Sequence, residues 1–272
     1  MSSFMSRRDL DFLLHEWLGT EELLARERYA DHSRETVDAV LDLAEQIATT
    51  EFAPHNRASD LTEPTYDGST VTVIPEVAVA LQVFADAGFL TADVEEGSVL
   101  PSSVRAATMA WFQAANAGTS AYALLTSAAA NLLRKHGTPD QVRRYAVPMG
   151  DGRFFGTMML SEPHAGSNLA DITTRAEPQG DGTYRVFGRK MWISGGDHEM
   201  GENIVHLVLA RIPGSPAGTK GISLFVVPKH LVLDDGSLGE RNDLTLAGIN
   251  HKMGFRGTVN TAPVLGDGEI GR

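Results

Sequence analysis

Apolar residues in the first half of the chain recur at three- and four-residue steps, the spacing of one face of an α-helix. One such stripe follows Ser33, a residue type that caps helix N-termini. Its members are Val37, Val40, Leu41, Ala44, Ile47 and Ala48. A shorter cluster lies within residues 12–18, and a further stripe is bracketed by Pro75 and Gly88, residue types that open and close helices. The pattern therefore indicates several amphipathic helices.

Two alanine-rich segments, residues 102–116 and 119–136, predict a pair of helices in close contact. Thr138–Gln141 then combines a capping threonine, a proline at the first helical position and a glutamine three residues after the threonine. The helix that begins there is predicted to stop at Pro148, because proline lacks the backbone N–H that a helix interior needs. We expect an α-helical domain of five or six helices over residues 1–152.

The pattern changes at Gly150-Asp151-Gly152 to short apolar or alternating runs separated by glycine and proline turns. The predicted strands cover residues 153–160, 171–177, 183–194, 203–211, 221–228 and 258–265. Such a series is typical of an antiparallel barrel or sandwich. We therefore expect an α+β fold in which the helical domain is followed by an antiparallel β-barrel domain over residues 153–272.

Composition and charge narrow the possible partners. Apolar residues make up 42% of the 272 residues and charged residues 21%, which is enough for a packed core. The net charge of −12 gives no general attraction to nucleic acid or anionic membranes, so we exclude both as main partners. No cysteine is present, which rules out disulfides and thiolate chemistry. Because no run resembles a signal peptide or a membrane span, we predict a cytoplasmic protein.

Two segments of the β half carry candidate chemistry. Residues 158–168 place a strand before a loop of small residues, whose N–H groups and hydroxyls could bind a planar polar ligand or a phosphate. The alternative is a strand with an ordinary turn. In residues 188–196, Trp192 and Ser194 would share one side of a strand and offer a flat apolar surface beside a hydroxyl. The alternative there is a core tryptophan near a hairpin end.

Other chemistries find less support in the pattern. None of the nine histidines has a metal-binding spacing, so we predict no metal site. The chain has no Gly-x-Ser-x-Gly elbow, P-loop or dinucleotide-binding glycine motif, which leaves a hydrolase triad as a weak option. The residues alone therefore indicate two domains, of which the β half could hold a flat polar cofactor.

Three segments resemble the acyl-CoA dehydrogenase family, in the order in which that family carries them. They are Lys135–Gln141, Leu160–Asn168 and Gly188–Ser194, and the resemblance covers roughly residues 35–272. The opening Asp11–Leu18 and the later His251–Gly254 resemble the large-subunit branch, which includes 3-methylmercaptopropionyl-CoA dehydrogenase-like proteins. The resemblance implies an FAD-dependent enzyme that desaturates an acyl-CoA thioester between its α and β carbons.

The family motifs also imply which residues hold the flavin. Those residues are Met158, Leu160, Ser161, Trp192, Ile193 and Ser194. Ser161 and the main chain around Leu160 would bond the pyrimidine edge, Trp192 would cover the ring, and Ser194 would lie near N5. Ser167 would bind the pantetheine or phosphate end of the substrate. Serine replaces the commoner threonine at positions 161 and 194 and keeps the hydroxyl.

Two further departures concern the substrate rather than the flavin: Asn168 stands for the usual aspartate and Gly195 for the usual asparagine. The family's catalytic base is a glutamate on a C-terminal helical bundle, and we expect that base outside this chain. Glu162 belongs to the flavin motif and is not assigned as the base. We therefore expect the chain alone to bind FAD poorly and to be inactive.

The resemblance implies partners as well. These are an acyl-CoA substrate, electron-transfer flavoprotein or a similar acceptor, and either a homo-oligomer or a partner chain that supplies the helical bundle. Alternatives are an acyl-CoA oxidase or related flavoenzyme, and a non-catalytic dehydrogenase-like subunit. An unrelated α+β binding domain would require all three motifs to be coincidental.

Overall fold

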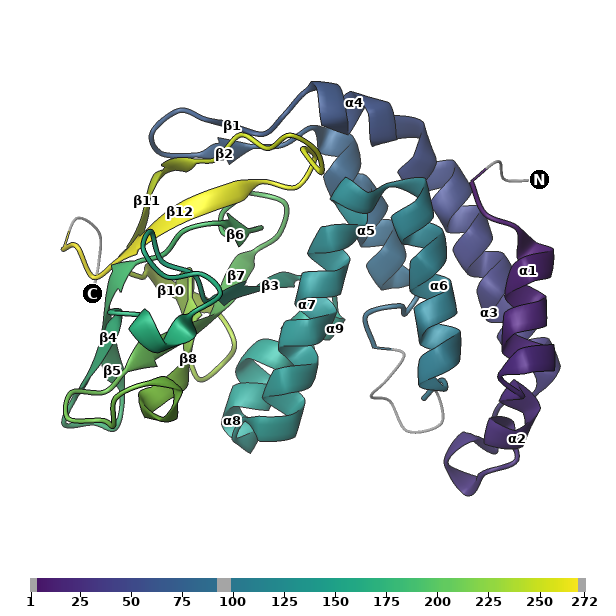
Figure 1. The fold of residues 1–272 in the computed structure, drawn as a ribbon, viewed down its shortest axis with the longest axis horizontal. Coiled ribbons are helices and arrows are strands. Elements are labelled where there is room, and N and C mark those ends of the chain that lie inside the picture. The colour runs from purple at the N-terminus through teal and green to yellow at the C-terminus, as the bar shows by residue number, and fades with distance from the viewer. Residues whose placement is uncertain (1–3, 92–98, 269–272) are drawn as a thin grey trace.

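The computed structural model describes residues 4–91 and 99–268 and divides them into a helical half and a sheet half (Figure 1). The chain begins with α1, Arg7–Asp11, which continues as a π-helical turn, Phe12–Trp17. The other helices before the sheet are α2 (Thr20–Leu24), α3 (Arg34–Ile47), α4 (Asn56–Leu61), α5 (Pro75–Asp86), α6 (Ser102–Ala115), α7 (Ala117–His136), α8 (Pro139–Gln141) and α9 (Val147–Gly150).

The helical half is built around an aromatic core. The ring of Phe112 lies 4.9 Å from that of Phe52 and 4.7 Å from that of Phe84, centroid to centroid. All three side chains are fully buried, and they come from α6, from the π turn after α3 and from α5. The helices predicted near residues 34–48, 75–88, 102–116 and 119–136 are confirmed to within about three residues, the usual uncertainty of helix ends.

Two local predictions for this half are corrected. The helix after Thr138 does not stop at Pro148 but continues through α9 to Gly150. A π-helical turn over Val142–Ala146 precedes the proline, so Pro148 falls in the first turn of α9, where its missing N–H costs little. In addition, a small hairpin of β1 (Thr65–Tyr66) and β2 (Val71–Thr72) interrupts the helices and was not predicted.

The sheet half contains one large sheet and a separate two-stranded hairpin. Its strands are β3 (Phe154–Met159), β4 (Arg175–Pro178), β5 (Tyr184–Arg189), β6 (Ile193–Ser194), β7 (Asn203–Arg211), β8 (Ile222–Pro228), β9 (His230–Val232), β10 (Leu238–Arg241), β11 (Leu244–Ile249) and β12 (Asn260–Leu265). The large sheet has the order β11-β12-β5-β4-β7-β3, with β6 paired to β12 and β8 paired to β7. The hairpin is formed by β9 and β10.

The α+β class is confirmed, with corrections to the sheet. Most pairs are antiparallel, but β3 runs parallel to β7, because the chain returns through β4, β5 and β6 rather than through a hairpin. The described strands form a curled sheet whose pairing does not close into a barrel. Strands β9, β10 and β11 were not predicted, and the strand predicted over residues 183–194 breaks between Arg189 and Ile193.

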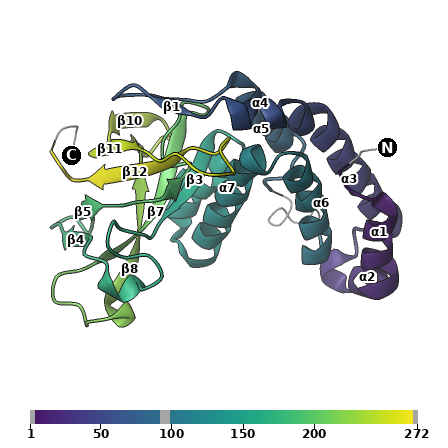
Figure 2. The same ribbon diagram turned by 45° about the horizontal axis from the view of Figure 1, so that its top comes forward.

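Helix α7 joins the two halves, lying between the sheet and α6 (Figures 1 and 2). Its Tyr122 hydroxyl accepts a hydrogen bond of 2.8 Å from the Val259 backbone N–H. Its Thr126 hydroxyl accepts one of 3.1 Å from the Gly156 N–H of β3. The placement of a domain boundary at residue 152 stays a prediction, although the last α-helix among the described residues ends at Gly150 and β3 begins at Phe154. Among the described helices, none has the length and apolar character needed to cross a membrane.

Candidate functional site

The segment after β3 is held by a buried ion pair. Glu162 is 3% exposed, and its carboxylate lies 3.1 Å from the Lys190 ammonium, whose side chain is fully buried. Thr173 and Thr174 each donate a backbone N–H and a hydroxyl to the same carboxylate, at 2.5–3.0 Å. Lys190 also donates to the Leu160 carbonyl at 3.1 Å. The loop that carries Leu160 and Ser161 is therefore fixed from within the protein.

The environment of Glu162 determines its charge. Burial alone would raise the pKa of its carboxyl, but hydrogen bonds from Thr174 and Thr173 outweigh burial and lower the pKa to about 2. Burial lowers the pKa of Lys190, and the charge of Glu162 opposes that effect. A carboxylate with two occupied oxygens and so low a pKa is a poor proton acceptor. Glu162 is thus a structural anion.

One backbone hydrogen bond brings the two predicted motifs together. The Met191 N–H donates to the Ser161 carbonyl at 3.0 Å, so residues 158–161 and 191–194 lie side by side. Neither Ser161 nor Ser194 is fully buried, and Trp192 is 59% exposed. Among the described residues, no group bonds the Ser161 hydroxyl, which leaves it available to a ligand.

The expected geometry of Trp192 is wrong. It does not share one strand with Ser194, because Lys190 turns inward toward Glu162 and ends β5 at Arg189. Trp192 then adopts a left-handed backbone with φ of +63°, which is rare for a bulky residue. Such strain persists only where the surrounding structure imposes it, and it concentrates at binding sites.

Strand β12 supports the second motif. Asn260 lies opposite Ser194 and Thr261 opposite Ile193, and the Asn260 amide donates to the Ser194 hydroxyl at 3.5 Å. Ile193 is buried, in the same apolar cluster as Met159. Among the predicted flavin residues, Ile193 therefore packs in the core, whereas the hydroxyl of Ser194 is held by the side-chain amide of Asn260.

Ser167 forms no hydrogen bond with the residues of the two motifs. It is exposed in a bend that follows the turn closed by paired hydrogen bonds between the backbones of Glu162 and Ala165. Asn168 caps a short helical turn, accepting from the Ala170 N–H at 3.3 Å and donating to Asp171 at 2.8 Å. The hydrogen bonds of Asn168 therefore hold the loop that contains Ser167. Ser167 itself has no hydrogen-bond partner among the described residues.

Sequence reasoning missed a cavity of about 180 Å³ next to Ser194. Its lining residues are Glu63, Pro64, Ile249, Asn250, His251, Arg256, Thr258, Val259 and Asn260. Asn260 is shared with the Ser194 contact, and Asn250 reaches the Met191 sulfur at 3.6 Å. Arg256 binds Asp60 at 2.7 Å and so ties this wall to α4. No local pattern could reveal the cavity, because it forms between β11, β12 and the segment after α4.

Comparison with known proteins agrees with this architecture. Residues 157–267 match the family model described as the acyl-CoA dehydrogenase middle domain. The chain is 34% identical over 252 residues to a 3-methylmercaptopropionyl-CoA dehydrogenase of Ruegeria pomeroyi, covering 92% of this chain and 43% of the relative. It is 32% identical over 269 residues to a butyryl-CoA dehydrogenase of Syntrophomonas wolfei, covering 96% and 44%.

A solved structure resembles the fold. It is an acyl-CoA dehydrogenase from Bacillus anthracis complexed with FAD, with a TM-score of 0.66 at 22% identity, covering 88% of this chain and 36% of that one. The chain thus shares the fold of the corresponding part of that structure. The chain belongs to the acyl-CoA dehydrogenase family. It spans less than half the length of the two curated relatives.

Proposed function

We propose that this chain forms the flavin- and thioester-binding part of an FAD-dependent acyl-CoA dehydrogenase, which desaturates an acyl-CoA between its α and β carbons. The hydrogen bond from Met191 to Ser161 is the observation that carries the proposal. It brings the backbone of Ser161, whose hydroxyl is free among the described residues, next to the segment that carries the exposed and strained Trp192 and the supported Ser194. These groups suit the polar edge, the face and the reactive centre of a planar heteroaromatic cofactor.

The residues present fit FAD. Ser161 and the main chain at Leu160, which Lys190 holds in place, would bind the pyrimidine edge of the flavin. Trp192 would cover one face of the ring, and Ser194 would donate its hydroxyl near N5. When bound, FAD accepts the substrate's β hydrogen as hydride. Donors that are already in place stabilise the negative charge that arrives with it.

The substrate and the electron acceptor follow from the same proposal. Ser167, in the exposed loop after Glu162, would meet the pantetheine or phosphate end of the acyl-CoA. Electron-transfer flavoprotein or a similar acceptor would reoxidise the flavin. Glu162 takes no part in proton abstraction, because Lys190, Thr173 and Thr174 occupy its carboxylate.

The proposal is tested by titrating the purified chain with FAD and recording its visible absorbance and tryptophan fluorescence. FAD should bind weakly, as expected above for the chain alone, and Trp192→Ala should weaken that binding by a further factor of about ten, the effect of losing roughly 1.4 kcal/mol of stacking. Trp17→Ala is the matched control, because Trp17 is 73% exposed and lies on the first helix. No binding at saturating FAD, or an equal loss in the Trp17 variant, would contradict the proposal.

A further inference from the structure

We propose a second site, for a divalent transition cation of the zinc type, formed by Asp11, His15 and Asp38. It lies between the first helix and α3, at the end of the molecule far from the large sheet (Figure 1). The proposal is independent of flavin binding, because it involves none of the residues assigned to the flavin or the substrate.

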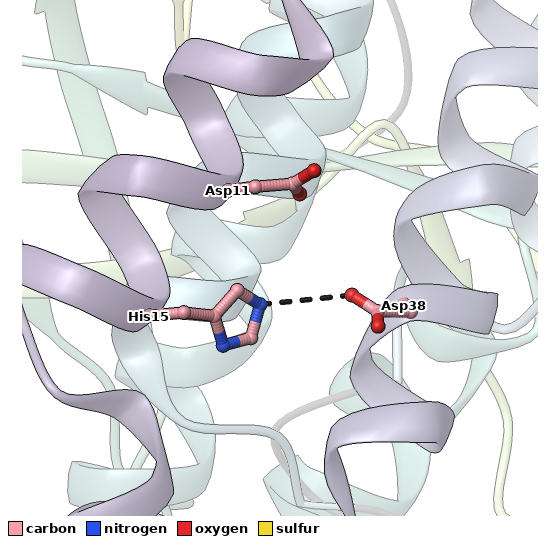
Figure 3. Close-up of side chains that lie close together, drawn as sticks. All are labelled: Asp11, His15 and Asp38. Atoms are coloured by element: carbon pink, nitrogen blue, oxygen red, sulfur yellow. Dashed lines mark ion pairs between the residues drawn. The ribbon is translucent and has the colours of Figure 1, made fainter.

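The three side chains converge from two helices. Asp11 and His15 are four residues apart and so lie on one face of the first helix. Asp38 projects toward them from α3, with its carboxylate 3.6 Å from the His15 Nε2 (Figure 3). One ligand atom from each of the three residues lies within 4.8 Å of the other two. A single ion between the helices could therefore reach all three.

The environment of His15 is a separate observation that indicates a bound ion. Its side chain is only 3% exposed, yet its Nε2 has no hydrogen-bond partner and faces Asp38. Its Nδ1 is held by Glu21 at 2.8 Å. A carboxylate on one ring nitrogen, with the other aimed at the ion, is the arrangement that orients metal-binding histidines. An unpaired buried nitrogen is unfavourable, and coordination would satisfy it.

The charged groups around the site carry a net negative charge that a divalent cation can neutralise. Four carboxylates and two guanidinium groups take part in the ion pairs of this cluster. The carboxylates belong to Asp11, Glu21, Asp38 and Asp42, and the guanidinium groups to Arg7 and Arg34. The difference between four negative and two positive charges is −2, which a divalent cation neutralises.

Arg7 is the competitor that the ion must displace. Its Nε binds Asp11 at 2.8 Å, while its Nη2 lies 3.5 Å from Asp38. Its third contact, to Asp42 at 2.5 Å, is with a side chain that is 73% exposed and outside the three ligands. Arg7 can therefore keep Asp42 as a partner when the cation takes Asp11 and Asp38.

The ligand set selects the class of metal. Mg²⁺ and Ca²⁺ prefer all-oxygen sites, whereas one imidazole nitrogen with carboxylates suits Zn²⁺, and a water molecule would complete four-coordination. Bound between α3 and the first helix, the ion would join the N-terminal segment to the helical core. Histidine spacing alone could not predict the site, because Asp38 comes from a second helix.

The test is isothermal titration of the chelator-treated protein with Zn²⁺, and with Mg²⁺ for comparison. We expect one Zn²⁺ site that Mg²⁺ does not fill, and a higher melting temperature with Zn²⁺. His15→Gln and Asp38→Asn should each weaken Zn²⁺ binding by roughly tenfold or more, and Glu21→Gln by about 10- to 100-fold. Arg7→Gln should strengthen binding, because it removes the competing cation.

Two control variants should leave Zn²⁺ affinity unchanged. Glu45→Gln removes one negative charge from the same helix about 10 Å beyond Asp38, and His136→Gln removes an exposed histidine on α7. Circular dichroism of each metal-free variant checks that it is folded. If the unaltered protein binds no Zn²⁺, the proposal is overturned, and the three residues are only part of a cluster of ion pairs. Binding that survives His15→Gln, or that Arg7→Gln fails to strengthen, would overturn it as well.

Discussion

At the scale of single residues, the pair of Glu162 and Lys190 determines the shape of the candidate flavin surface. The lysine is drawn into the protein by the carboxylate and by the carbonyls of Leu160 and Leu209, at 3.1 and 2.8 Å. This inward turn ends β5 and sets Trp192 in its left-handed conformation. Two buried charges thus control the exposed aromatic surface beside them, although neither charge is assigned a contact with the cofactor.

Glu162→Gln should destabilise the fold by about 3–5 kcal/mol, because it leaves the Lys190 ammonium buried without a counter-ion. Urea denaturation measures the change. Glu177→Gln serves as the control, since its partner Arg175 is 56% exposed, and about 0–1 kcal/mol is expected. Adding Lys190→Met to Glu162→Gln should recover part of the loss. Additive losses in the double variant would show that the two residues are not coupled.

The strain at Trp192 can be separated from its proposed contact with flavin. Glycine tolerates a φ of +63°, whereas alanine pays a cost of roughly 1–2 kcal/mol there. Trp192→Gly should therefore be about 1 kcal/mol more stable than Trp192→Ala, after allowance for the flexibility of glycine in the unfolded chain. Both variants should bind FAD equally weakly. Equal stabilities would argue against strain at this position.

At the scale of elements, helix α7 covers the free edge of β3. One edge of β3 pairs with β7, and on the other side the Thr126 hydroxyl of α7 accepts the Gly156 N–H. A Cβ on Gly156 would lie 2.5 Å from the Cβ of Ala129. The close approach of helix and strand therefore requires small residues on both surfaces, and it protects an edge that could otherwise pair with another chain.

Gly156→Ala should cost about 1–3 kcal/mol, because the added methyl group forces α7 and β3 apart. The change is read from the midpoint of chemical denaturation. Gly180→Ala is the matched control, since a Cβ there meets nothing within 4 Å. A loss of less than about 0.5 kcal/mol at position 156 would mean that the interface adjusts freely.

Periodicity predicted the elements that are continuous and local. The sequence predicted α3, β7 and β8 because each of these elements has either one repeating apolar face or one unbroken apolar run. The break between β5 and β6 at residues 190–192 could not be predicted from the sequence. It depends on Glu162, far away in the sequence, and the local pattern around Trp192 is that of a strand.

The candidate site was predictable to a similar extent. The family motifs named Ser161, Trp192 and Ser194, and the structure brings their segments together through Met191. The supporting Asn260 was missed, because its role comes from the pairing of β6 with β12, which no local pattern specifies. His15 was missed for the same reason, since its environment is created by packing between two helices.

At the scale of the whole molecule, buried histidines make stability depend on pH. His198 lies in ring contact with Tyr122 and Phe155, and His206 bonds the Thr157 hydroxyl at 2.7 Å. Burial, followed by the charge of Lys229, lowers the pKa of each histidine to about 3 from its ordinary value of 6.5. Both rings are therefore neutral in the folded protein at physiological pH.

Acid should weaken the fold between pH 6.5 and 3. In this range the unfolded chain binds protons on both histidines and the folded protein does not, so stability falls as pH falls. The loss is up to roughly 2 kcal/mol for each histidine between pH 7 and 5. Glu162 adds to it below its ordinary pKa of 4.5, since its folded pKa is about 2.

Urea denaturation at pH 7 and pH 5 measures this dependence. His198→Phe keeps a ring between Tyr122 and Phe155 but cannot take up a proton, so its loss of stability between the two pH values should be smaller. His136→Gln should behave as the unaltered protein, because His136 is exposed. An unchanged pH dependence in His198→Phe would contradict the assignment.

The pairing of β6 with β12 has a consequence for the order of events during synthesis. Ser194 is held by Asn260, which leaves the ribosome 66 residues later. The helical half and β3 can begin to pack while translation continues, since their contacts are closer in sequence. The surface around Ser161, Trp192 and Ser194 is complete only after β12 has emerged and docked. Under the proposed assignment, the flavin would bind late, and a nascent chain that stalls before residue 260 would carry both motifs without the completed surface.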